Sequence, residues 1–155
     1  MATGCPDVDM VGLVRLSIDP SANPDDYDFV HRIRVRFVET DAMGIVHHAA
    51  YLPYLESARV EYMRAIGHPY SALREEGTDI AVLEAYVRYV RALRFDDEVD
   101  VHVVAASATR STIQLGYLLT CGDVAAATAV TIHGCVDQRG RPTRMPAWLK
   151  ELPAN

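Results

Sequence analysis

The alternation of hydrophobic and polar residues predicts five β-strands. From residue 31 to 37, arginines alternate with Ile33, Val35 and Phe37, and a period of two is typical of a strand with one buried face. Four later segments are rich in Val, Ile, Thr and Tyr, and the short links between them favour antiparallel neighbours. These predicted strands span residues 80–91, 99–107, 112–121 and 124–136.

A single long helical pattern separates the first strand from the other four. Apolar residues recur at helical spacing from Tyr51 to Ile66, with polar residues on the other faces. Pro53 is tolerated only in a first turn, so the helix should begin close to Tyr51, and Gly67 and Pro69 should end it. Shorter helices are expected at residues 70–76 and within residues 146–152.

One strand, a long helix and four antiparallel strands make an α+β fold class. A helix of about 16 residues is roughly 24 Å long, enough to cover one face of a five-stranded sheet. The other face and the edges must be covered or paired, so we expect a dimer. Residues 1–29 contain a stretch crowded with Asp, Pro, Ser and Asn and are interpreted as an N-terminal extension or arm, with one folded domain at 30–155.

Composition excludes several classes of protein. The chain has 155 residues, half of them hydrophobic and 23% charged, as in an ordinary globular domain. A net charge of −6 argues against nucleic-acid binding, and no apolar run reaches the length of a membrane span or a secretory signal. Three cysteines without a CxxC pair argue against a disulfide framework or a zinc site, so a cytoplasmic location is expected.

Residues 39–51 carry the groups best suited to catalysis. A helix start presents unpaired N–H groups and a partial positive charge that can hold a developing oxyanion. Asp41 precedes Tyr51 by ten residues, so the loop could fold its carboxylate back toward that helix end, as a base or nucleophile for acyl transfer. Taken alone, however, an Asp after a Thr just past a strand is more often a turn former or a cap.

Three segments resemble motifs of the 4-hydroxybenzoyl-CoA thioesterase family of hotdog proteins, in particular its Tol-Pal-associated acyl-CoA thioesterase branch. They are VRFVETDAMGIVHHAAYLPYLESAR at 35–59, YVRALRFDD at 89–97 and RGRPTRMP at 139–146. The resemblance covers about residues 31–152. It implies a hotdog fold, a five-stranded antiparallel sheet wrapped around one long central helix. It also implies a homodimer or a dimer of dimers (a homotetramer) with active sites at the subunit interface.

The resemblance implies hydrolysis of an acyl-CoA or acyl-carrier-protein thioester to a free acid and a thiol. Asp41 matches the catalytic carboxylate, and His48 matches the position whose backbone N–H polarises the carbonyl. The side chain of His48 could orient water or Asp41. No metal or redox cofactor is implied. The chain departs from the family pattern at Ala50, where Asn is usual, at Ala92, where Pro is usual, and at His47, where an aromatic residue is common.

Other residues are expected near the substrate. The predicted substrate contacts are Met43, Gly44, Val46, His47, Tyr51, Arg91 and Arg94. Arginine suits phosphate, so Arg91 and Arg94 could hold the phosphates of coenzyme A; the alternative is salt bridges on an exposed strand. Glu56 lies eight residues after His48, where a second branch of the superfamily has a helix Glu. It is therefore an alternative acid/base, or else part of a structural ion pair with Arg59 or Arg36.

Two other functions stay open at this point. One is a hotdog dehydratase or hydratase acting on hydroxyacyl thioesters, whose His and acidic residue belong to a different motif that is not found here. The other is a non-catalytic hotdog protein that binds acyl groups or partners. The identity and length of the acyl group cannot be derived from the residues.

Overall fold

A computed structural model describes residues 18–152 of the chain. Residues 1–17, which form most of the expected arm and include Cys5, lie outside this range, as do residues 153–155. The division into an arm at 1–29 and a domain at 30–155 therefore stays a prediction.

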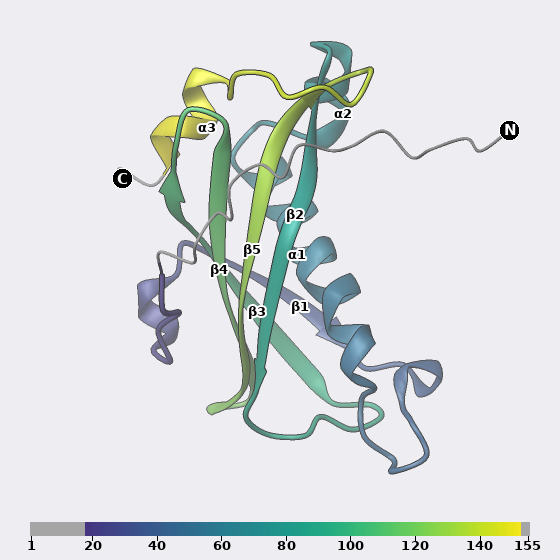
Figure 1. Cartoon of the computed structure of the whole chain (residues 1–155). Coiled ribbons are helices and arrows are strands. Elements are labelled where there is room, and N and C mark those ends of the chain that lie inside the picture. Colours follow the sequence, from purple (N-terminus) through teal and green to yellow (C-terminus); the bar gives the residue numbers. More distant parts are fainter. Residues whose placement is uncertain (1–17, 153–155) are drawn as a thin grey trace, which may run out of the picture.

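The centre of the fold is a five-stranded, fully antiparallel sheet (Figure 1). In spatial order its strands are β1 (Phe29–Arg34), β3 (Glu98–Ala108), β4 (Thr112–Cys121), β5 (Val124–Asp137) and β2 (Thr78–Tyr89). The predicted strands are thus confirmed, except that the first ends at Arg34 rather than Phe37. Phe37–Glu39 instead forms a short 3-10 helix, because the Glu39 carboxylate accepts from the backbone N–H and the guanidinium of Arg36 at its start.

The predicted central helix, α1 (Tyr51–Ala65), lies against the inner face of this sheet (Figure 1). Its buried residues are Tyr51, Tyr54, Leu55, Ala58, Arg59, Tyr62 and Met63. They pack in one cluster with inner-face residues of the strands such as Val101, Leu115 and Ala127. The short helices α2 (Tyr70–Glu75) and α3 (Ala147–Glu151) follow where the sequence predicted them. The α+β hotdog fold is confirmed.

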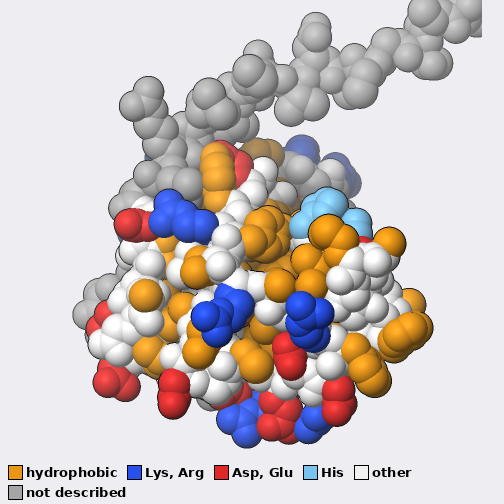
Figure 2. Space-filling model, turned by 90° about the horizontal axis from the view of Figure 1, so that it is seen from below, with side chains coloured by type: hydrophobic (Ala, Val, Ile, Leu, Met, Phe, Trp, Pro, Cys, Tyr) orange, Lys and Arg blue, Asp and Glu red, His pale blue; other side chains and the backbone are white. Residues whose placement is uncertain are grey.

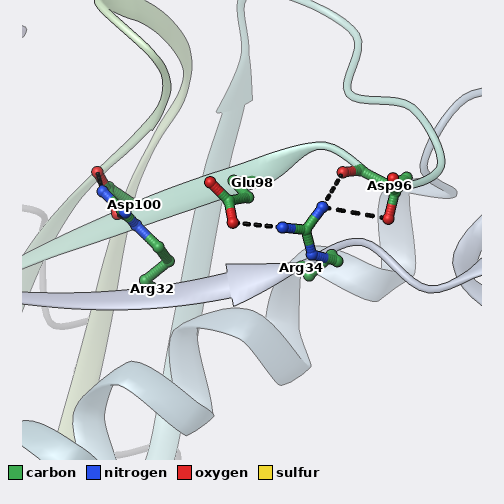
Figure 3. Close-up of polar contacts among 5 residues, drawn as sticks. All are labelled: Arg32, Arg34, Asp96, Glu98 and Asp100. Atoms are coloured by element: carbon green, nitrogen blue, oxygen red, sulfur yellow. Dashed lines mark hydrogen bonds and ion pairs between the residues drawn. The ribbon is translucent and has the colours of Figure 1, made fainter.

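Charged side chains join β1 to its neighbour β3 (Figure 3). Arg32 binds the carboxylate of Asp100 through two hydrogen bonds of 2.7 and 2.9 Å, and the two residues are paired in the strand register. Arg34 bonds to Glu98 and to the backbone and carboxylate of Asp96. The arginines that alternate along β1 therefore hold this edge strand in place from its solvent side.

The other edge of the sheet, β2, is apolar and open. Within residues 18–152, β2 pairs only with β5. Its side chains stay exposed on both faces, among them Val82 (54%), Leu83 (47%) and Tyr86 (44%). An exposed hydrophobic edge strand invites pairing with another strand.

Residues 18–28 lie over the outer face of the sheet. The Tyr27 ring lies 6.0 Å from the His102 ring. Asp19 forms a 3.8 Å ion pair with Arg88, and the side chain of Ile18 lies close to Gly116. The described part of the arm thus contacts β2, β3 and β4.

Candidate active site

A tight turn determines the position of Asp41. The Asp41 N–H donates to the carbonyl of Ile45 at 2.9 Å, and the Gly44 N–H donates back to the carbonyl of Asp41 at 2.9 Å. Gly44 has a φ of +73°, a left-handed conformation that glycine adopts without steric cost. Thr40 and Val46, on either side of the turn, form an antiparallel bridge. The loop therefore presents Asp41 at the tip of a small hairpin.

Two backbone hydrogen bonds attach this hairpin to the rest of the site. The Val46 N–H donates to the carbonyl of Leu93 at 2.8 Å, and the His47 N–H donates to the carbonyl of Glu39 at 2.8 Å. The first bond joins the motif at 35–59 to the motif at 89–97. Two segments that are distant in sequence thus meet beside Asp41.

Glu39 connects the start of the loop to α1. Its carboxylate accepts hydrogen bonds from the Arg36 backbone and guanidinium, both at 2.8 Å, and from the Tyr54 hydroxyl at 2.6 Å. Burial raises the pKa of Glu39, but these hydrogen bonds outweigh it and leave the pKa below its usual value. Burial and the bond to Glu39 in turn raise the pKa of Tyr54. Both groups therefore keep their roles as acceptor and donor at neutral pH.

The helix start presents a free backbone donor. A 3-10 turn, His48–Ala50, precedes α1, and the ring Nδ1 of His47 caps it by accepting from the Ala49 N–H at 3.1 Å. No residue in the described range accepts a hydrogen bond from the His48 N–H. The Tyr89 hydroxyl donates to the His48 carbonyl at 3.1 Å and so fixes the backbone next to that free N–H.

Asp41 and His48 line the same pocket, with a volume of about 250 Å³. Of the residues predicted from the sequence, the pocket brings together Asp41, Met43, Val46, His48, Tyr51 and Arg91. Ile45, Tyr89, Val90 and Ala92 also line it and were not predicted. Tyr89 had a sequence signal, since it begins the second motif at 89–97.

Four of the predicted residues lie outside this pocket. Gly44 forms the turn, and His47 caps the helix start with its ring 4.1 Å from that of His48. The backbone N–H of Arg94 donates to Asp97. Glu56 lines a separate cavity farther along α1.

The carboxylate of Asp41 has one oxygen held and one oxygen free. Its Oδ1 accepts from the Met43 N–H at 2.8 Å, so Asp41 is a turn former as well as a candidate catalyst. Its Oδ2 accepts no hydrogen bond from residues 18–152. The turn therefore fixes the direction of the carboxylate and leaves an oxygen available for chemistry.

The site lies at an open, apolar end of the molecule. Figure 2 views the end where the loop before α1 and the loop between β2 and β3 meet, and shows histidine and basic side chains among hydrophobic ones. Exposed hydrophobic residues on these loops include Val38 (80%), Met43 (73%) and Val90 (61%). Exposed hydrophobic side chains gathered at one end of a molecule are typical of an interaction surface.

The basic residues of strand β2 and the loop after it do not act as one group. Arg88 pairs with Asp19 on the outer face, and the carboxylates of Asp96 and Glu98 are taken by Arg34. Arg91 lines the pocket and has no ion-pair partner among residues 18–152. The alternative of a salt-bridged arginine row is therefore wrong for Arg91.

Within residues 18–152, no group of three or more His, Cys, Asp or Glu side chains could hold a metal ion. No helix in the same range is both long and apolar enough to cross a bilayer.

Comparison with known proteins places this site in a family. Residues 35–152 match the model of the thioesterase-like superfamily. The chain belongs to the thioesterase-like superfamily. It is 30% identical to the acyl-CoA thioesterase YbgC of Haemophilus influenzae over 127 residues, 81% of this chain and 93% of that protein.

Two solved structures support the same assignment. A protein of Aquifex aeolicus is 39% identical, with a TM-score of 0.76, over 81% of this chain and 98% of that one. A thioesterase of Thermus thermophilus complexed with coenzyme A and zinc is 29% identical, with a TM-score of 0.72, over 83% and 99% of the two chains. The predicted family and enzyme class are confirmed: this superfamily member is a thioester hydrolase.

Proposed function

We propose that the chain hydrolyses an acyl-CoA, or an acyl-carrier-protein thioester, at the pocket between Asp41 and His48. The observation that carries the proposal is that a free carboxylate oxygen and a free helix-start N–H belong to the same pocket. A carbonyl bound by the His48 N–H would be polarised as its oxygen gains negative charge. One such donor is typically worth about 3–4 kcal/mol in the transition state.

Asp41 supplies the second half of the reaction. Its free oxygen either attacks the carbonyl carbon, giving a mixed anhydride that water then hydrolyses, or takes a proton from the attacking water. In the first route the C–S bond breaks, and the thiolate leaves and takes a proton from solvent. In the second route the C–S bond breaks as Asp41 passes the proton of the water to the leaving sulfur. Oδ1 stays bonded to the Met43 N–H, so the carboxylate needs no reorganisation during the reaction.

A second copy of the chain would complete the pocket. In one copy, His48 is exposed and Met43 is 73% exposed, although a thioester site needs walls that exclude water. The open β2 edge lies next to this site, because Tyr89 ends that strand and lines the pocket. We therefore propose a homodimer, or a dimer of dimers, in which this edge and the exposed loops pack against a partner subunit.

Arg91 is the best-placed residue to hold the carrier. It lies on the pocket wall and carries a charge that no carboxylate in the described range neutralises. A guanidinium matches phosphate geometry, so Arg91 would contact a phosphate of coenzyme A or of a carrier-protein phosphopantetheine. Arg94, three residues on, is exposed and could make a second contact.

The test is a thiol-release assay over a panel of acyl-CoA substrates with Asp41→Asn. Asn can keep the acceptor for the Met43 N–H but cannot act as a base or a nucleophile. We expect kcat to fall by roughly 10²–10⁴ with an unchanged melting temperature. Asp123→Asn, at an exposed aspartate of the β4–β5 hairpin, is the control and should keep full activity. Full turnover by Asp41→Asn would overturn the proposal, as would hydration of an unsaturated acyl-CoA without hydrolysis.

A further inference from the structure

A second, larger cavity lies between α1 and the inner face of the sheet. Its volume is about 450 Å³. Its exposed wall residues include Leu52 (46%), Val82 (54%) and Glu56, while Tyr117 and His133 are fully buried. The cavity therefore has a mostly apolar mouth and an interior lined partly by polar side chains.

The buried end carries a chain of hydrogen bonds that stops at an unpaired atom. The Tyr117 hydroxyl lies 3.0 Å from the Thr131 Oγ1, which lies 2.7 Å from the Nε2 of His133. When the Tyr117 hydroxyl donates to Thr131 and Thr131 donates to Nε2, the ring hydrogen of His133 lies on Nδ1. That Nδ1 has no partner among residues 18–152, although it is buried.

Arg59 places a positive charge beside the same cavity. Its side chain is only 8% exposed, and no carboxylate of the described residues lies within ion-pairing distance. Its Nη1 donates to the Tyr70 hydroxyl, and its guanidinium lies 5.1 Å from the centre of the Tyr70 ring. A neutral partner does not balance a buried charge, and buried charges are normally paired.

Two unsatisfied groups thus meet at one cavity. Burial and the charge of Arg59 lower the pKa of His133 to about 3, so its ring stays neutral and offers an N–H rather than a second charge. Together the two side chains offer donors to an oxygen with negative charge. Glu56 also lines the cavity, but it is exposed and lies on the turn of α1 nearer the mouth.

The cavity is close enough to the thioester site to receive part of the same substrate. Tyr51 lines the first pocket, and Glu56 and Arg59 follow it by five and eight residues on α1. At 1.5 Å per residue, these offsets are about 8 and 12 Å along the helix. A thioester carbonyl at the helix start could therefore extend its acyl chain past Leu52 toward Arg59.

We propose that this cavity binds the far end of the acyl group and selects acyl chains that end in a carboxylate, with Arg59 and His133 as the groups that bind it. The inference rests on the proposed function, since it assigns a substrate class to that site. An apolar chain would leave the guanidinium without an anion and the Nδ1–H without an acceptor, whereas a terminal carboxylate satisfies both together. The apolar mouth accommodates the methylene groups between the two ends.

The first test compares matched substrates that differ only at the far end. The pairs are glutaryl-CoA with pentanoyl-CoA, and adipoyl-CoA with hexanoyl-CoA. We expect kcat/KM to be at least tenfold higher for the carboxylate member of one or both pairs. Equal values, or a preference for the methyl member in both pairs, would overturn the inference.

The second test removes the charge and the donor separately. Arg59→Met should lower kcat/KM for the carboxylate substrates at least tenfold and change that for the methyl substrates less than threefold. Arg64→Met is the matched control, because Arg64 lies on the exposed side of the same helix and pairs with Glu61. His133→Leu gives an independent reading if Arg59→Met fails to fold, and should reduce the same preference several-fold.

Glu56→Gln separates this inference from a catalytic role for Glu56. Removing its negative charge should raise kcat/KM for the carboxylate substrates and leave the methyl substrates unchanged. If Glu56 were the acid or base, the variant would instead lose activity toward both. If Glu56→Gln keeps its activity toward both kinds of substrate but raises kcat/KM for neither carboxylate substrate, the result would contradict a carboxylate site in this cavity.

A binding measurement distinguishes failure of the inference from failure of the proposed function. Non-hydrolysable thioether analogues of glutaryl-CoA and pentanoyl-CoA are titrated into the unmodified protein by calorimetry. Tighter binding of the carboxylate analogue without hydrolysis of any thioester would support the cavity assignment and overturn the enzyme mechanism. Hydrolysis with no carboxylate preference in rate or binding would support the enzyme mechanism and overturn the cavity assignment.

Discussion

At the scale of single residues, the site depends on groups that position other groups. The Tyr89 hydroxyl is one such positioning group. It holds the carbonyl of His48, whose N–H is the proposed oxyanion donor. Such a residue should affect the rate through geometry rather than through chemistry.

We predict that Tyr89→Phe lowers kcat about fivefold, because a single hydrogen bond contributes about 1 kcal/mol. Tyr86→Phe is the matched control: Tyr86 lies on the same strand and donates to Glu84 at 2.7 Å, away from the pocket. Steady-state kinetics with one acyl-CoA checks both variants. Equal losses in the two would show that the effect comes from strand β2 and not from His48.

Residue patterns could predict the first pocket but not the second cavity. Asp41, His48 and Tyr51 lie within one short segment, so their meeting follows from a loop and a helix start. Arg59 and His133 are 74 residues apart, and each alone is unremarkable: an arginine on a helix and a histidine in an alternating strand. Only the folded structure shows that both line one cavity, where Arg59 lacks an anionic partner and the Nδ1 of His133 lacks any partner among residues 18–152.

At the scale of elements, the Asp41 turn is held by backbone geometry, and Gly44 tests this. Adding a Cβ at Gly44 would meet nothing within 4 Å, so the cost of Gly44→Ala comes from its φ of +73° and not from a clash. We expect a loss of about 1–2 kcal/mol of unfolding free energy, together with a clear loss of kcat as the turn reorganises around Asp41. Urea denaturation and kinetics measure the two effects.

Gly140→Ala separates local strain from catalysis. Gly140 has a φ of +76° and equally open surroundings, but it lies in the turn after β5, outside the pocket. The two variants should lose similar stability, while only Gly44→Ala should lose activity. Unchanged activity in Gly44→Ala would mean that the turn does not control the carboxylate.

At the scale of the whole molecule, one copy exposes hydrophobic side chains both at the site and along β2. We predict that light scattering after size exclusion gives the mass of a dimer or a dimer of dimers. Val82→Lys, at the exposed edge, should shift the mass toward the monomer, because a lysine on an edge strand opposes pairing. Val124→Lys, on the β4–β5 hairpin, is the control and should keep the native mass. A monomeric native protein with full activity would contradict the shared site.

Acid stability links the buried cavity to the whole fold. Because the pKa of His133 in the folded chain is about 3 and that of an unfolded histidine is about 6.5, the unfolded chain binds the proton first as pH falls. The contribution of His133 to stability is therefore complete above pH 6.5 and declines toward pH 3, with an expected loss of about 2 kcal/mol between pH 6.5 and 4.5.

His102, whose pKa burial also lowers, adds a smaller slope of the same sign. Carboxylates such as Glu39 and Asp100, whose pKa values their partners lower, act mainly below this window. Among the groups facing the ring, the positive charge of Arg59 opposes protonation of His133. Urea denaturation at several pH values should show this slope in the native protein and a shallower one in His133→Leu. An unchanged slope in that variant would mean that burial and the charge of Arg59 do not hold the His133 ring neutral in the folded chain.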